Sequence, residues 1–191
     1  MNYVMFENLK EDFKMCYGNP RLMPCYFFTS MSFRYMVIWR TLHYLYSIKH
    51  LRMFYHLLYP IHILNSYATG IQCSPKTSMN GGVKFSHFSN IVINARSKIG
   101  SHMMIFNGVT LGSVRSDDET DGAPTIGNYV FIGPGAKILG NVHVGDYVLI
   151  GANCVVTKDI PEGSTVVGNP ARIINCNAKK NLKYYFKDIT I

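Results

Sequence analysis

The chain has 191 residues, the length of one domain with at most a short appendage. Apolar residues make up 48% of the sequence and charged residues 16%, so the chain can bury a core and does not belong to the disordered class. The formal net charge of +8 points to an anionic partner, and no recognised nucleic-acid-binding motif accompanies it.

The N-terminus and the cysteines bear on the cellular compartment. Three acidic residues precede any apolar run, which argues against a secretory signal, and no run of 18 apolar residues is present to span a bilayer. The five cysteines are widely spaced and include no Cys-x-x-Cys pair, which predicts reduced thiols rather than a disulfide framework or a zinc knuckle. The sequence therefore predicts a soluble, cytoplasmic protein.

The first part of the chain, residues 1–68, is predicted to be a helical segment. The stretch 34–59 is rich in Leu, Met and aromatic residues and lacks Gly and Pro. It stops at Pro60, and proline removes a helical hydrogen bond, so one helix is predicted to end there.

The stretch between Asp12 and Asp117 carries eleven Lys and Arg residues and no acidic residue. On one continuous helix, Arg34, Lys49 and Arg52 would share a sector of about 60°. Such a face fits a membrane surface or an anionic glycolipid. The more common arrangement, a helix packed on its neighbours with its charges in solvent, remains open.

An aliphatic residue recurs every six positions in the second half of the chain. A period of six fits neither an α-helix nor an alternating strand, but it fits short extended segments joined by turns. Three such segments form one triangular coil of a parallel β-helix, and stacked coils bury an aliphatic column. An accidental spacing in a β-sandwich would not explain ten matches out of ten. The ten positions are Ile93, Ile99, Ile105, Leu111, Ile126, Ile132, Ile138, Val144, Ile150 and Val156.

The predicted fold class is therefore mainly β, with the β-helix at residues 69–173. The fifteen-residue gap from Leu111 to Ile126 is not a multiple of six, so a loop at 113–124 is expected to protrude from the coils. This loop holds an acidic cluster, and it is either functional or a solvated charged loop. Residues 174–191 carry four lysines and are predicted to form a basic C-terminal tail or a final helix.

One histidine stands out beside the repeat. Extending the six-residue spacing backwards from Ile93 places His87 at a column position, where an imidazole needs a hydrogen-bonding partner. A lone histidine is usually structural, but a neutral histidine facing a cleft is the natural general base for a hydroxyl group. Both interpretations remain open from the residues alone.

Four motifs occur in a fixed order: HFSNIVIN, NGVTLG, IGPGAKILGNVHVGD, and GANCVVTKDIP followed by VVGNPARII. With them, the run from about Gly70 to Ile173 resembles the left-handed β-helix, hexapeptide-repeat acyltransferases, specifically the serine acetyltransferase-like branch. It also resembles capsule and O-antigen polysaccharide O-acetyltransferases, which often carry a short helical N-terminal segment.

The resemblance implies direct acetyl transfer from acetyl-CoA to a hydroxyl group, without a metal. It implies a homotrimer with each active site between two subunits. His87 matches the catalytic base of the family, and a backbone N–H would hold the oxyanion.

The resemblance also implies where CoA binds. Small residues at Gly112, Ala136 and Ala152 are expected to let the pantetheine arm approach the edge of the coils. Lys158 and Arg172 are expected to contact the CoA phosphates. Plain surface charge is an equally good interpretation of these two cations.

Three positions depart from the serine-specific members. Those enzymes carry Asp immediately before the catalytic His and Asp in the first coil, where this chain has Ser86 and Gln72. They carry a second His where Ala123 stands here. Asp117 or Asp118 of the acidic loop is a candidate to orient His87 in place of the missing carboxylate.

These departures favour a sugar hydroxyl as acceptor. The leading hypothesis is an O-acetyltransferase of bacterial surface polysaccharide, with peripheral contact to the inner membrane surface. The alternatives are serine O-acetyltransferase of cysteine biosynthesis and a non-catalytic hexapeptide-repeat scaffold subunit. A carbonic anhydrase is disfavoured, because the solenoid histidines His87, His102 and His143 lack the spacing of a zinc site.

Overall fold

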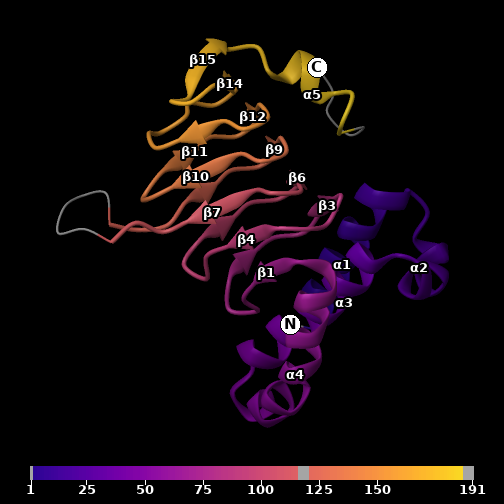
Figure 1. Cartoon of the computed structure of the whole chain (residues 1–191). Coiled ribbons are helices and arrows are strands. Elements are labelled where there is room, and N and C mark those ends of the chain that lie inside the picture. Colours follow the sequence, from indigo (N-terminus) through magenta and orange to yellow (C-terminus); the bar gives the residue numbers. More distant parts are fainter. Residues whose placement is uncertain (1, 116–120, 187–191) are drawn as a thin grey trace.

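The computed structural model describes residues 2–115 and 121–186, with helices first and a stack of short strands after them (Figure 1). The helical elements are α1 (Asn2–Tyr17), η1 (Pro20–Leu22), α2 (Met23–Thr29), α3 (Met31–Ser47), η2 (Lys49–Leu51), α4 (Arg52–Thr69) and, near the C-terminus, α5 (Lys179–Leu182). The strands are β1 (Ile71–Cys73), β2 (Ser78–Met79), β3 (Lys84–Ser86), β4 (Ile91–Ile93), β5 (Lys98–Ile99), β6 (Met104–Phe106), β7 (Thr110–Gly112), β8 (Thr125–Ile126), β9 (Phe131–Ile132), β10 (Lys137–Leu139), β11 (His143–Val144), β12 (Leu149–Ile150), β13 (Val155–Val156), β14 (Thr165–Val167) and β15 (Arg172–Asn175).

The strands form a parallel β-helix of about five coils, which confirms the predicted fold class. Its three sheets have the orders β1-β4-β7-β10-β13, β11-β8-β5-β2 and β15-β14-β12-β9-β6-β3. An ordinary coil takes 18 residues, as between Ile93 and its partner Leu111. Leu111 pairs with Ile138, 27 positions later, so this coil contains the extra residues of the protruding loop.

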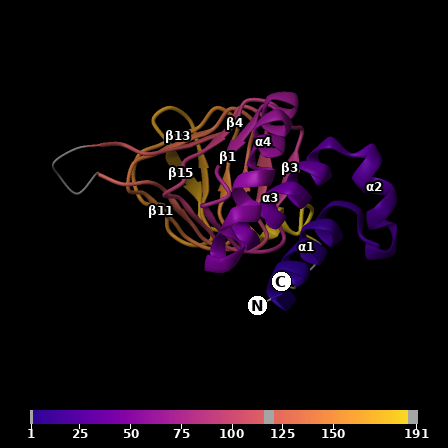
Figure 2. The same cartoon turned by 90° about the horizontal axis from the view of Figure 1, so that it is seen from below.

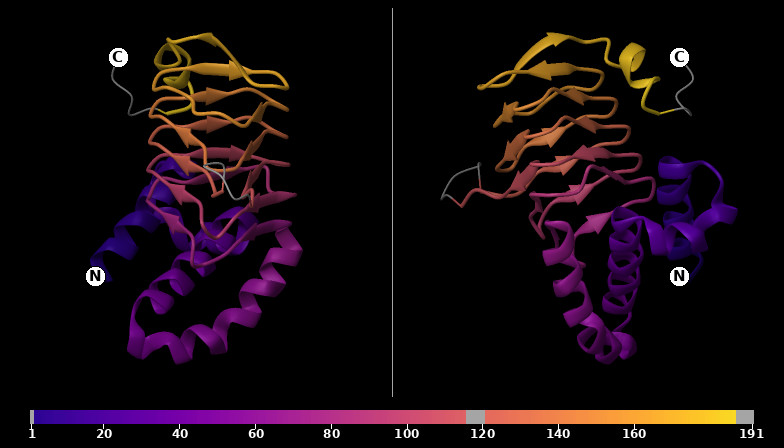
Figure 3. Two further views of the ribbon diagram at one scale, coloured as in Figure 1. Left: turned by 90° about the vertical axis from the view of Figure 1, so that its left-hand side faces the viewer. Right: turned by 45° about the vertical axis from the view of Figure 1, so that its right-hand side comes forward.

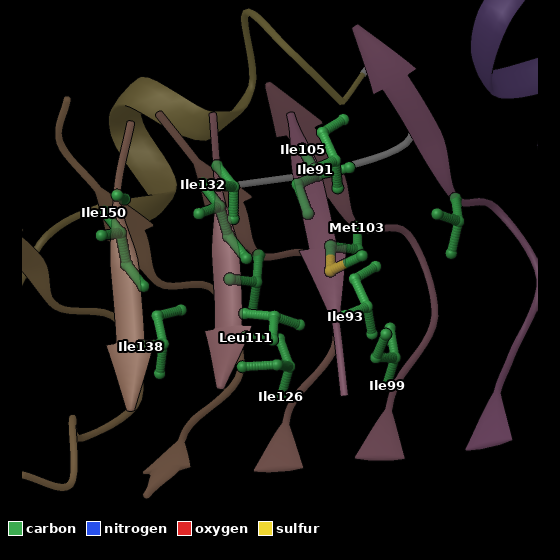
Figure 4. Packing of buried hydrophobic residues seen from close by; sticks show 14 of the residues in the cluster. Ile91, Ile93, Ile99, Met103, Ile105, Leu111, Ile126, Ile132, Ile138 and Ile150 are labelled. Carbon is green, nitrogen blue, oxygen red and sulfur yellow. The ribbon is translucent and has the colours of Figure 1, made fainter. Parts of the chain in front are cut away.

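The aliphatic column fills the interior of the coils (Figure 4). All ten predicted column residues are at most 3% exposed. Because each coil stacks its aliphatic side chains on those of the next, one continuous core runs along the solenoid axis. The six-residue repeat therefore predicts these side-chain positions correctly.

The first coil departs from this spacing. Cys73, Met79 and Phe85 pair in register with Ile93, Ile99 and Ile105, each 20 positions later rather than 18. All three pairs span the corner 87–90, so the two extra residues lie there. The prediction that His87 occupies a column position is therefore wrong. Phe85 fills that place, and His87 is exposed.

The prediction of one continuous helix that ends before Pro60 is also wrong. Ile48 adopts an extended conformation (φ −107°, ψ 113°), so the chain turns between α3 and α4. Pro60 lies inside α4, which continues to Gly70, where a left-handed cap (φ 65°) ends it. Arg34 and Arg52 consequently lie on different helices and do not share one helix face.

Helix α3 crosses the open end of the first coil, as the view from below shows (Figure 2). Its side chains satisfy backbone groups that a preceding coil would otherwise pair. The hydroxyl of Tyr35 lies 3.3 Å from the Cys73 oxygen and 3.2 Å from the Cys73 nitrogen. The indole of Trp39 donates to the Ser74 oxygen at 3.1 Å. Helix α3 therefore caps the solenoid through its side chains.

A buried ion pair anchors this cap. Arg40 donates to both carboxylate oxygens of Asp12 at 2.8 and 3.0 Å, and both side chains are at most 2% exposed. Arg40 also donates to the Met79 and Asn80 oxygens, while the Val83 N–H donates to Asp12 at 2.8 Å. Each polar group of the pair is thus satisfied by α1, α3 or the first coil.

The C-terminal residues close the last edge of the third sheet and cover part of that sheet's outer face. Strand β15 runs antiparallel to β14. Beyond it, Ala178, Leu182 and Phe186 are buried against Met104 and Phe131 of the third sheet. Within the described residues, no helix is long and apolar enough to cross a membrane.

Candidate active site

His87 lies in the expanded corner between β3 and β4. The corner residues His87, Ser89 and Asn90 all have positive φ values (61°, 132° and 51°). The backbone of this corner lies against the end of α4. A Cβ added to Gly70 would lie only 3.0 Å from the Asn90 nitrogen. On the next coil, the Gly108 N–H donates to the Ser89 oxygen at 3.0 Å. The corner thus projects His87 outward from a firmly held backbone.

The His87 imidazole is open to incoming groups. Its ring centre lies 5.9 Å from that of Phe106, which supports one side of it. No described residue makes a hydrogen bond to either ring nitrogen. Ser86, the preceding residue, is half-buried at the end of β3. An exposed imidazole with both nitrogens available can accept a proton from a substrate hydroxyl.

The acidic loop leaves the solenoid at a different corner. His87 precedes β4, whereas the loop follows β7, and these strands are parallel neighbours. His87 and the described flanks of the loop therefore lie at opposite ends of two neighbouring strands. The flanks project sideways from the stack in Figure 1. Asp117 and Asp118, the predicted orienting residues, lie outside the described residues. Asp121, at the described flank, forms an exposed ion pair with Arg96 at 3.4 Å.

Gln72 lines a cavity of about 420 Å³ between α4 and the first two coils. Tyr59, His62 and Ser66 of α4 form the opposite wall. His62 is only 4% exposed, and burial lowers its pKa below the ordinary histidine value. Sequence reasoning missed this wall; the polar spacing of His62, Asn65, Ser66 and Thr69 along one side of α4 was the available signal.

The thiol in this cavity is unreactive. Cys73 is buried, and burial raises the pKa of its thiol to about 12, so it stays protonated at neutral pH. All five cysteines are free. A protonated, buried thiol does not serve as a nucleophile, so the cavity offers no route through an acetyl-cysteine at Cys73.

The three small residues predicted to flank CoA do not share one edge. Gly112 ends β7 beside the loop. Ala152 is exposed at the corner after β12, and its backbone nitrogen would lie 2.8 Å from a Cβ added to Gly133. Ala136 is fully buried in the core. Its side chain therefore does not line an open edge, which corrects the prediction for that residue.

The two predicted phosphate ligands are both exposed, Lys158 after β13 and Arg172 on β15. A third cation lies nearer the His87 corner: Lys137 donates to the Gly108 oxygen and, at 3.1 Å, to the Thr110 hydroxyl. In the described part of the chain, no group of three His, Cys, Asp or Glu residues is arranged to hold a metal ion.

Comparisons with known proteins agree with this architecture. Residues 123–158 match the family model for bacterial transferase hexapeptide (six repeats). A serine acetyltransferase from Helicobacter pylori is 41% identical over 125 residues, which cover 65% of this chain and 72% of that protein. One from Bacillus subtilis is 34% identical over 180 residues, covering 93% of this chain and 81% of that protein. A solved serine acetyltransferase in complex with CoA superposes with a TM-score of 0.74 at 31% identity, covering 91% of this chain and 71% of that one.

The coils and the matched repeats thus place the chain among the hexapeptide-repeat transferases. More particularly, the chain belongs to the serine acetyltransferase family. It is an acetyl-CoA-dependent O-acetyltransferase, as the resemblance implied.

The polysaccharide hypothesis is wrong. The relatives and the structural neighbours are consistently serine acetyltransferases, which favours the alternative acceptor over a surface sugar. The three departures at Gln72, Ser86 and Ala123 concern single side chains, and they do not outweigh a similarity that extends over 93% of the chain.

Proposed function

We propose that this protein transfers the acetyl group of acetyl-CoA to the hydroxyl of L-serine. The observation that carries the proposal is the similarity to serine acetyltransferases over 93% of this chain, which includes the helical segment as well as the coils. The exposed His87 at the expanded corner supplies the chemistry that this reaction needs.

His87 acts as general base in this proposal. Acetyl-CoA, when bound, supplies an activated thioester. A neutral ring nitrogen of His87 accepts the serine hydroxyl proton as the oxygen attacks the acetyl carbon, and the proton then neutralises the departing thiolate. Phe106 lies beside the ring, with the two ring centres 5.9 Å apart, and the imidazole itself is exposed to solvent.

In this proposal, two neutral side chains contact the acceptor. Gln72 is exposed on the outer face of β1, and Ser86 directly precedes His87. Both offer an oxygen that accepts a hydrogen bond from the ammonium group of serine. In each of these hydrogen bonds only the serine ammonium is charged, whereas an aspartate at either position would add a second charged partner. Serine is therefore expected to bind more weakly here than it would with aspartate at residue 72 or 86.

A homotrimer with active sites between subunits belongs to the same proposal. Its support is the absence of a hydrogen-bonding partner for His87 within the described residues, which leaves room for a group from a neighbouring copy. A cytoplasmic location also belongs here, and its support is the set of five free cysteines.

The direct test is release of CoA thiol from acetyl-CoA by the purified protein with and without L-serine. Wild type is expected to show serine-dependent release. His87→Ala is expected to reduce kcat by about 10²- to 10⁴-fold, the usual contribution of a general base. His143→Ala is the matched control, because His143 is exposed on β11 and lies outside the proposed site. Release that ignores serine, or that persists in His87→Ala, would overturn the proposal.

Ser86→Asp tests the acceptor contacts. A carboxylate beside His87 adds a charge-assisted bond to the serine ammonium, so KM for serine is expected to fall by up to about tenfold while KM for acetyl-CoA stays constant. Initial rates across serine concentrations measure the change. A KM for serine that stays unchanged or rises would show that residue 86 does not face the acceptor.

A further inference from the structure

Helix α4 presents its apolar side to solvent and its polar side to the protein. Its buried residues include His62, Asn65 and Thr69, which pack toward α3 and the first coil. Its large aliphatic residues point the other way. This is the reverse of a surface helix in a soluble protein, whose apolar stripe faces the core.

The exposed apolar residues form one continuous stripe, here called the α4 stripe. At 100° per residue they occupy a sector of about 100° on the helix. Their side chains are between 46% and 71% exposed. Apolar side chains exposed next to one another mark an interaction surface, whereas single exposed ones are ordinary. The stripe consists of Met53, Phe54, Leu57, Ile61 and Leu64.

Cations gather where the stripe begins. Arg52 is the first residue of α4, and its guanidinium lies 5.0 Å from the centre of the Tyr46 ring. The Lys76 ammonium lies 5.1 Å from the same ring, and Lys49 is exposed in the turn before α4. None of the three cations forms an ion pair with a carboxylate of the described residues, and residues 13–116 contain no Asp or Glu.

The stripe also lies at one extremity of the molecule. The α3–α4 hairpin projects beyond the first coil, away from the stacked strands, in both views of Figure 3. A flat surface can therefore approach the α3–α4 hairpin without meeting the solenoid.

We propose that the α4 stripe and its cations dock the protein onto an anionic lipid surface. The apolar residues insert at the boundary between headgroups and acyl chains, while Lys49, Arg52 and Lys76 bind the lipid phosphates. Tyr46, held between two of these cations, has the amphipathic character of residues that lie at headgroup level.

Charge favours lipid over a second copy of this chain. A second copy docked hairpin to hairpin would bring another basic surface against the first, and no carboxylate from residues 13–116 would pair with the cations. An anionic surface satisfies the cations and covers the stripe together. This docking is independent of the acceptor proposed above.

Co-sedimentation with large unilamellar vesicles tests the proposal on the full chain. One set contains phosphatidylcholine alone, and the other contains equal parts of phosphatidylcholine and phosphatidylglycerol. The wild-type protein is expected to sediment with the anionic vesicles and to remain in solution with the neutral ones. Added salt is expected to release it, because ions screen exposed charges.

Two double variants separate the contributions. Leu57→Gln with Leu64→Gln removes apolar area and is expected to weaken vesicle binding by at least about tenfold. Lys49→Gln with Arg52→Gln is expected to weaken it by about twenty-five-fold, from about fivefold for each cation near an anionic surface. All four residues are exposed, so circular dichroism and thermal unfolding are expected to match wild type.

Val167→Gln with Ile174→Gln is the matched control, because these exposed apolar residues lie on β14 and β15 at the far end of the solenoid. It is expected to bind vesicles as wild type does. Equal binding to both vesicle sets, or binding unaffected by the α4 variants, would overturn the proposal. So would α4 variants that change only the oligomeric state in light scattering, since the stripe would then join copies of this chain. Serine-dependent thiol release, measured without lipid, is expected to be unchanged in every variant, so failure of docking is distinguishable from failure of the proposed function.

Discussion

The helical segment and the coils differ in what they bury. In the coils, most buried side chains are apolar and stack on those of the coil before, and the buried polar ones are hydroxyls such as Thr77, Ser97 and Ser164. In the helical segment, the buried set includes Asp12, Arg40, His62 and Asn65, while α4 exposes its aliphatic residues. The coils therefore derive their stability from many similar contacts, whereas the helical segment depends on a few specific ones.

The sharpest test of this difference is Asp12→Ala. It leaves the Arg40 guanidinium buried without its partner and the Val83 N–H without its acceptor. We expect the free energy of unfolding to fall by about 3–5 kcal/mol, as for other broken buried ion pairs. Urea denaturation followed by circular dichroism measures it.

Asp121→Ala is the control for that experiment. The ion pair of Asp121 with Arg96 is exposed on both sides, so its loss is expected to cost at most about 1 kcal/mol. Similar losses in the two variants would contradict the special role given to the buried pair.

A second comparison uses the same substitution in both regions. Ile132→Ala removes a fully buried column residue and is expected to cost about 2–5 kcal/mol through lost packing and the cavity left behind. Ile61→Ala, on the exposed stripe of α4, is expected to stay within about 0.5 kcal/mol of wild type. Unfolding curves decide between this expectation and an α4 stripe that already packs within the molecule, for which Ile61→Ala would be costly.

The smallest expected effect concerns pH. Burial lowers the pKa of His62 in the folded state, so below its ordinary value of 6.5 the unfolded state binds more protons. Stability from His62 is therefore fully present above pH 6.5 and is lost as pH falls through that value. Wild type is expected to lose more stability between pH 7 and pH 5 than His62→Gln. Parallel pH dependences would show that His62 does not titrate differently on folding.

Repetition explains how much of the fold could be predicted from the sequence. Each column residue of the coils has another column residue six positions before or after it, so the ten positions together identify the repeat. The corner at 87–90 carries no such marker, and its two extra residues displaced His87 from the place that the spacing assigned to it. The helix break at Ile48 and the continuation through Pro60 depend on packing against the coils, which local sequence patterns do not encode.

The candidate site likewise has parts that the sequence predicts and parts that only the folded chain shows. His87 could be found from its motif, and its exposure follows from the corner. The cavity beside Gln72 could not be found, because its far wall comes from α4, and only the folded chain brings His62 and Ser66 against the first coil. Likewise, Ala136 could be recognised as small, but its burial depends on the register of the coils.

A stack of coils has no length limit of its own, since each exposed strand edge is a template for another. Here Tyr35, Trp39 and Arg40 bond to backbone groups of the first coil, and β15 closes the last edge of the third sheet with an antiparallel strand. The helical segment is thus a terminator of growth as well as a cover. Its side chains prevent solenoids of separate molecules from joining end to end into a fibre.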